Sequence, residues 1–216
     1  MFCGIAGSGL IQHITFYLLM FLGAIVGAII VYGKDAGDKL HFTTYNLPVF
    51  NVVLYGIVIG LMLALVENFS TGNTMFVYQS VETSSILGFG DIGLISLVVF
   101  ALIFSLITAF GEETLTRGFL NSIAENFADS KMSKNISKYF LIPLIFTMLH
   151  FFMWNRLEGV ILSAFVILFL LMYHFTFAIV CQFSMDVTAS IYTPIAIHMV
   201  YNAIKLLMML QAQGAF

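Results

Sequence analysis

The chain has 216 residues, of which 61% are hydrophobic and only 9% are Asp, Glu, Lys or Arg, and its mean hydropathy is +1.03. This composition excludes a soluble domain of ordinary make-up, because such a domain carries about 25% charged residues. The formal net charge of -3 comes from few groups and gives no reason to expect a nucleic-acid partner. The sequence therefore predicts one integral membrane domain, residues 1–216, in contact with the lipid bilayer.

The chain contains six apolar stretches. A helix rises 1.5 Å per residue, so about 20 apolar residues cross the roughly 30 Å of hydrocarbon in a bilayer. In chain order they are 10–32, 47–66, 92–111, 139–155, 159–185 and 187–204. They predict an all-α, polytopic transmembrane helix bundle of about six spans. Between the second and third stretches, residues 67–85 read as a polar connection.

After the third span, apolar residues recur at helical spacing with polar residues between them. The apolar set is Phe119, Leu120, Ile123, Ala124 and Phe127, and the polar set is Asn121, Ser122, Glu125 and Asn126. This pattern predicts an amphipathic helix lying at the membrane interface.

The basic residues give an orientation. The densest positive cluster is Lys131, Lys134 and Lys138, and basic loops favour the cytoplasmic side. Counting spans places Lys34 and Lys39 on that same side and leaves Arg156 and Lys205 near the opposite one. We expect a multi-pass protein whose functional site opens towards the cytoplasm.

Two adjacent carboxylates, Glu112 and Glu113, end the third span. Ionisable groups at that depth are costly unless they are paired or functional. Glu113 and Arg117 stand one helical turn apart and can pair, whereas Glu112 faces about 100° away without a local partner. An unpaired carboxylate in an apolar site is a candidate general base.

The fourth and sixth spans each carry a histidine. Phe146 and His150 share one helical face, and so do His198 and Asn202. A lone buried histidine more often has a structural role in packing than a functional one. Polar groups on three separate helices can meet only inside the bundle, however, and that convergence favours a functional site. Upstream of His198, the pair 193–194 is Thr-Pro, which predicts an N-cap and a first helical residue.

These residues form three ordered motifs. The motifs are Glu112-Glu113-x-x-x-Arg117, Phe146-x-x-x-His150 and His198-x-x-x-Asn202. Together they resemble the motifs of the CAAX-processing and bacteriocin-processing (CPBP or Abi) family of intramembrane proteases, over a catalytic core of about 92–210.

The resemblance implies peptide-bond hydrolysis inside the membrane. It assigns water activation to Glu112 and His150, and binding of the developing oxyanion to His198 and Asn202. The remaining motif residues, Glu113, Arg117 and Phe146, would then support the site. Thr114 and Thr116 depart from the bulky apolar residues that are common there, and the number of spans is small.

The residues themselves are suited to this chemistry. Amide hydrolysis needs an activated water, stabilisation of the oxyanion and a proton for the leaving amine. We expect no cofactor, because a water activated directly by a carboxylate needs no metal and the chain contains no HExxH. The alternative is a zinc ion held by Glu112, His150 and His198, a His₂Glu set. Neither Cys3 nor Cys181 lies near the motifs, which disfavours a cysteine nucleophile.

The expected function is that of a glutamate-dependent intramembrane endopeptidase. Its substrate would be a hydrophobic or lipidated peptide or protein, such as a CAAX-type prenyl-protein or a bacteriocin or signalling-peptide precursor. The alternatives are a non-catalytic scaffold or bacteriocin immunity protein, and a transporter with a polar path. His13, His41 and His174 lack partner motifs and read as structural or interfacial residues.

Overall fold

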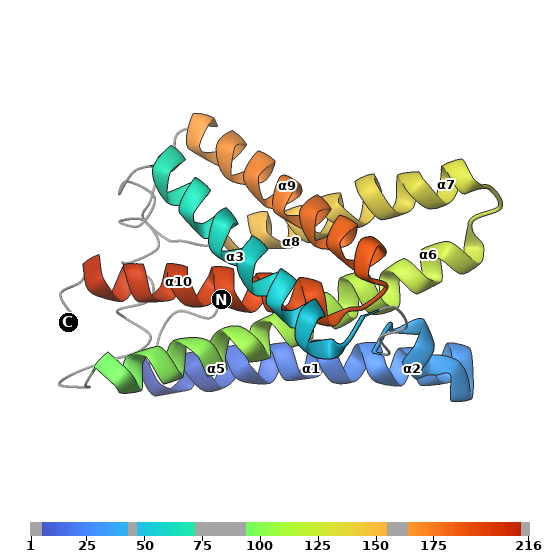
Figure 1. Ribbon diagram of the computed structural model, residues 1–216, viewed down its shortest axis with the longest axis horizontal. Coiled ribbons are helices and arrows are strands. Elements are labelled where there is room, and N and C mark those ends of the chain that lie inside the picture. Colours follow the sequence, from blue (N-terminus) through green and yellow to red (C-terminus); the bar gives the residue numbers. More distant parts are fainter. Residues whose placement is uncertain (1–5, 43–46, 72–93, 155–163, 213–216) are drawn as a thin grey trace.

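The computed structural model describes residues 6–42, 47–71, 94–154 and 164–212. Every regular element in these ranges is a helix, which confirms the all-α bundle (Figure 1). In chain order they are α1 (Ala6–Tyr32), η1 (Gly33–Asp35), α2 (Ala36–Lys39), α3 (Val49–Thr71), α5 (Leu94–Glu113), η2 (Thr114–Leu120), α6 (Asn121–Phe127), α7 (Lys131–Ile136), η3 (Ser137–Leu141), α8 (Ile142–Trp154), α9 (Ala164–Thr188) and α10 (Tyr192–Ala212).

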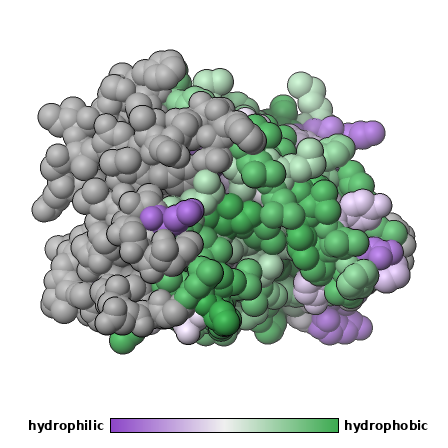
Figure 2. Space-filling model, turned by 60° about the vertical axis from the view of Figure 1, so that its left-hand side comes forward, coloured by the Kyte–Doolittle hydropathy of each residue, from purple (hydrophilic) through white to green (hydrophobic). Residues whose placement is uncertain are grey.

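The described helices have the character of membrane spans. Three segments are long and apolar enough to cross a membrane by length and composition: Ile14–Lys39, Val49–Glu67 and Leu94–Phe127. Large apolar side chains on their outer faces are exposed, and Figure 2 shows apolar residues covering much of the described surface. Since lipid tails solvate such a surface and water does not, the chain is an integral membrane protein. The count of six spans stays a prediction.

Helix α10 lies at the centre of the bundle. It packs along both α3 and α5, while α1 packs along α5 and α8 packs against α9 (Figure 1). Helices α3 and α10 approach closely at Gly56 and Gly60. A Cβ on Gly56 would lie 2.5 Å from Cβ of Ala196, and one on Gly60 would lie 2.6 Å from the carbonyl oxygen of Ile197. Only glycine allows α3 and α10 this separation.

The helix after the third span is present, but its faces differ from the prediction. Asn121 and Ser122 are buried, whereas Phe127 is 78% exposed. The Ser122 hydroxyl donates a hydrogen bond to the carbonyl of Lys39, at the end of α2. Two members of the polar set, Asn121 and Ser122, are therefore turned towards other parts of the chain, whereas Asn126 is exposed as predicted. The sequence pattern alone could not reveal that neighbour.

The polar connection expected at 67–85 begins later than predicted, and the part from 72 onward lies outside the described residues. Helix α3 continues to Thr71, so Glu67 is helical. Its carboxylate is buried and pairs with the ammonium of Lys205 at 2.6 Å. Lys205 was expected near the outer interface, and its burial in this pair removes it from any argument about orientation. Arg156 lies outside the described residues.

The start of α10 also differs from the prediction. The helix begins at Tyr192, so Thr193 is already helical and is not the N-cap. The Thr193 hydroxyl instead lies 2.8 Å from the hydroxyl of Thr188, at the end of α9. This side chain therefore joins the end of α9 to the start of α10.

Candidate active site

Glu112 and Glu113 are the last residues of α5, and both are buried. The chain then continues as the π-helix η2 before α6 begins. A π-helix is rare because it widens the helix and weakens its hydrogen bonds, and such turns occur frequently at functional sites. The two glutamates are thus presented at a break in the regular α-helical geometry inside the bundle.

The ion pair expected between Glu113 and Arg117 is present. Nη1 of Arg117 lies 3.1 Å from one carboxylate oxygen of Glu113 and 3.2 Å from the other. Nη2 donates to the carbonyl oxygen of Ala178 on α9 at 3.0 Å. The guanidinium also lies over the ring of Phe146, 4.6 Å from the centroid. Several partners on α5, α8 and α9 therefore compensate a fully buried positive charge.

Thr116 explains one departure from the usual pattern. Its hydroxyl donates to the carbonyl oxygen of Glu112 at 2.6 Å and accepts a hydrogen bond from Nη1 of Arg117 at 2.9 Å. A bulky apolar residue at this position could do neither. The threonine therefore takes part in holding the Glu113–Arg117 pair, which the sequence could not show.

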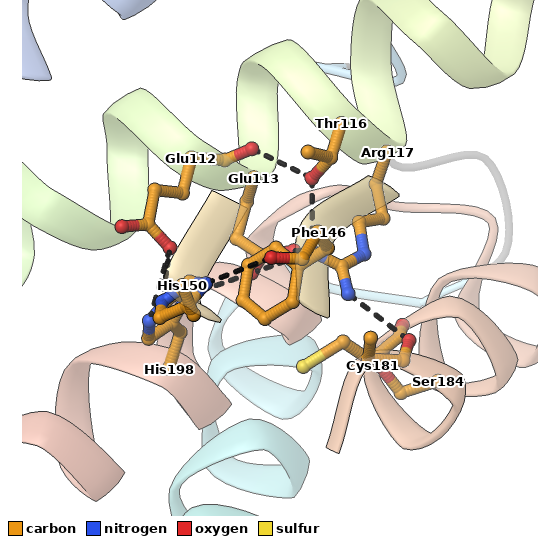
Figure 3. Close-up of polar contacts among 10 residues, drawn as sticks. Glu112, Glu113, Thr116, Arg117, Phe146, His150, Cys181, Ser184 and His198 are labelled. Atoms are coloured by element: carbon orange, nitrogen blue, oxygen red, sulfur yellow. Dashed lines mark hydrogen bonds and ion pairs between the residues drawn. The ribbon is translucent and has the colours of Figure 1, made fainter. Parts of the chain in front are cut away.

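Three of the predicted catalytic residues meet at one point (Figure 3). Oε2 of Glu112 lies 3.6 Å from Nε2 of His150 and 3.6 Å from Nε2 of His198. These separations are too long for good direct hydrogen bonds, and a single water beside the three atoms can contact each of them. Glu112 comes from α5, His150 from α8 and His198 from α10, so the tertiary structure brings them together.

The hydrogen bond at Nδ1 determines the tautomer of each histidine. Nδ1 of His150 lies 2.9 Å from the carbonyl oxygen of Phe146, and Nδ1 of His198 lies 2.7 Å from Oε1 of Glu113. Both partners only accept hydrogen bonds, so each Nδ1 carries the proton. In the neutral rings each Nε2 then presents a lone pair towards Glu112. Three acceptors converge, and such a group attracts a proton donor such as water.

Aromatic rings surround the two histidines. The Phe146 ring lies 4.4 Å from the ring of His150, and the Phe177 ring lies 5.2 Å from that of His198, centroid to centroid. The buried ring of His174 on α9 lies 5.0 Å from His150. His174 is thus adjacent to the site, although its sequence context contained no pattern that would indicate this.

The other predicted residues are placed as follows. Asn202 is half-buried and lies one turn beyond His198 on α10. His41 lies in the turn after α2, where its carbonyl accepts a hydrogen bond from the amide of Ile191 at 3.0 Å. The side chain of His13 is outside the described part of the structure.

The donor set of Glu112, His150 and His198 is of the type that zinc prefers. Among the described residues, however, no group of three His, Cys, Asp or Glu side chains is arranged to hold a metal ion. The residues fit zinc by type and not by arrangement. We therefore derive no step through a metal, and the expectation of a metal-free site stays a prediction.

A family model matches about half of the chain. The family model described as type II CAAX prenyl endopeptidase, Rce1-like, matches residues 94–204, which is 111 of the 216 residues of the chain. The matched region begins at the first residue of α5 and contains all three motifs. No curated protein and no solved structure matches the chain.

Proposed function

Because the chain belongs to the Rce1-like family of type II CAAX prenyl endopeptidases, we propose that it hydrolyses a peptide bond in a lipidated or hydrophobic protein by means of a water activated by Glu112. The family is a protease family and supports the class of reaction. The observation that carries the assignment of the base is the position of Oε2 of Glu112, 3.6 Å from Nε2 of both His150 and His198.

In the proposed first step, a water bound between Glu112 and His150 gives a proton to the Glu112 carboxylate. The water oxygen then bonds to the scissile carbonyl carbon, and the carbonyl oxygen takes up the negative charge. His150 holds the water through the lone pair on Nε2, since its Nδ1 proton is committed to the carbonyl of Phe146. Burial strengthens these electrostatic interactions because water does not screen them.

The oxyanion needs hydrogen-bond donors. The amide of Asn202 supplies one. His198 supplies another from Nε2 only when the ring is positively charged, because its Nδ1 proton already binds Glu113. The Glu113 carboxylate stabilises that charge. As the C–N bond breaks, the proton held by Glu112 passes to the leaving nitrogen, and the second proton of the attacking water stays on the new carboxyl group. The products are a carboxylic acid and an amine, so the proton count balances.

The substrate we propose is a prenylated protein with a C-terminal CAAX-type sequence, or another hydrophobic precursor peptide. Support comes from the family match and from the placement of the site among apolar helices, where a lipid-linked peptide can arrive from the bilayer. The site would open towards the end of the bundle that carries Lys131 and Lys134.

The test is cleavage by purified protein in liposomes. A farnesylated peptide ending in a CAAX sequence would be compared with the same peptide lacking the lipid, and products would be identified by mass spectrometry. We expect cleavage of the lipidated peptide, and loss of cleavage in Glu112→Gln. Asp129→Asn is the matched control, since Asp129 is an exposed carboxylate outside the site. Flux without cleavage would favour a transporter, and substrate binding without cleavage a scaffold.

A further inference from the structure

Two residues outside the family match form a buried ion pair. Glu67 on α3 and Lys205 on α10 are 2% and 8% exposed, and Oε1 of Glu67 lies 2.6 Å from Nζ of Lys205. The hydroxyl of Tyr201 donates to Oε2 of the same carboxylate, and Nζ of Lys205 also donates to that hydroxyl at 3.0 Å. The proposed mechanism uses none of these three groups.

Stability alone does not account for such a pair. Removing two charges from water costs several kcal/mol each, and well-packed apolar residues of similar volume are often as stable or more so. A buried polar contact does, however, select one arrangement among several that apolar packing would accept, as polar residues do in coiled coils.

Apolar packing at the interface between α3 and α10 would accept more than one axial arrangement of the two helices. Gly56, Gly60 and Ala64 recur every four residues on α3 and are buried against α10. A row of small residues at this spacing repeats itself about once per helical turn. A slide of α3 along α10 by about 5.4 Å therefore puts one small residue of α3 in the place of another. Glu67 follows on this buried side of α3 and breaks the repeat, because only one register brings its carboxylate to Lys205.

The site also requires α10 to hold one axial position in the bundle. Lys205 is seven residues beyond His198, about two turns along the helix and within about 20° of the same direction. The ring of Phe177 connects the two levels, since it lies 4.8 Å from the ring of Tyr201 and 5.2 Å from that of His198. A shift of α10 itself by one turn would separate His198 from Glu113 on α5, and the two side chains now lie 2.7 Å apart.

We infer that Glu67 and Lys205 are positioning residues that set the axial register of α3 on α10 and so hold His198 at Glu113. The inference about register stands on the structure, and only its effect on turnover rests on the proposed function.

The experiment measures register directly. Spin labels at Met62 on α3 and Gln211 on α10, both exposed, report the distance between the helices by pulsed electron paramagnetic resonance. The native cysteines are replaced by alanine. The test variant is Glu67→Leu/Lys205→Met, and the matched variant Glu67→Lys/Lys205→Glu reverses the pair while keeping both charges.

We expect the apolar double variant to melt at or above the temperature of the wild type, while its distance distribution broadens or shifts by about one turn, 5.4 Å. Turnover should fall about 10- to 100-fold with little change in KM. The reversed pair should restore the narrow distribution.

A narrow, unshifted distribution in Glu67→Leu/Lys205→Met would overturn the inference. So would failure of both double variants to fold, because the pair would then supply stability and not register. A wild-type protein that cleaves no substrate would overturn the proposed function and leave the distance measurement intact, so the two failures are distinguishable.

Discussion

Glu113 holds His198 through a hydrogen bond of 2.7 Å from Nδ1 to Oε1, while the same carboxylate pairs with Arg117 one helical turn along its own chain. One buried group thus links the motif on α5 to the motif on α10. It orients the ring of His198 and determines which nitrogen faces Glu112. The second glutamate of the pair is therefore more than a structural counter-ion, and this relationship makes its removal informative.

Replacing Glu112 tests the proposed base. Glu112→Gln keeps the size of the side chain and removes its ability to take a proton. We expect cleavage to fall by at least about 100-fold, with the protein still folded in membrane, because general base catalysis contributes about 10²- to 10⁴-fold. Turnover is measured with the lipidated peptide and folding by thermal melting. Near wild-type turnover would remove Glu112 from the mechanism.

The Glu113–Arg117 pair should affect both folding and activity. Arg117→Met leaves a buried carboxylate without its cation, and we expect a loss of roughly 3–5 kcal/mol in stability, seen as a lower melting temperature and yield. Glu113→Gln should lower turnover as well, because His198 loses its charged partner. The double variant Glu113→Gln/Arg117→Met is the control and should recover stability. An unchanged melting temperature in Arg117→Met would contradict the pairing.

Thr116 provides a sharper test of the same network. Thr116→Val keeps the shape of the side chain but removes its hydrogen bonds to Arg117 and to the carbonyl of Glu112. We expect a destabilisation of about 1–3 kcal/mol, because a buried donor on Arg117 loses its acceptor. Thr116→Ser should restore most of it. Equal melting temperatures for the valine and serine variants would show that the hydroxyl is unimportant.

The metal content separates two readings of the site. We expect active protein to contain less than one zinc per chain and to keep its activity after treatment with a chelator. The reason is that Glu112 itself can take the proton from water. Elemental analysis and activity before and after chelation check this. Stoichiometric zinc, with activity lost to chelator and regained on adding metal, would instead assign Glu112, His150 and His198 as ligands.

The orientation of the bundle can be measured with a single cysteine. Asn126 is an exposed residue of α6, close to the lysines of α7. In a chain without native cysteines, Asn126→Cys should react with a membrane-impermeant thiol reagent from the cytoplasmic side only. The C-terminal end of α3 is expected on the other side of the membrane. If a cysteine at an exposed position there were labelled from the same side as Asn126→Cys, the expected topology would be wrong.

The sequence by itself determined the features that lie within one helix. The spacing of Glu113 and Arg117 predicted their ion pair, because residues four apart on a helix are neighbours wherever the helix lies. The apolar runs predicted α1, α3 and α5 to within a few residues, since an uncharged stretch of that length can satisfy its backbone in lipid only as a helix.

Only the tertiary structure decided which side chains face one another across helices. In a helix of a soluble protein, the polar face shows which side meets water, and the opposite side therefore faces the core. In this chain the lipid and the core are both apolar, so the periodicity of apolar residues does not distinguish the side that faces lipid from the side that faces the core. That is why His174 beside His150, the buried side chains of Asn121 and Ser122, and the pair of Glu67 with Lys205 could not be read from the sequence. Their positions follow from packing of helices far apart in the chain.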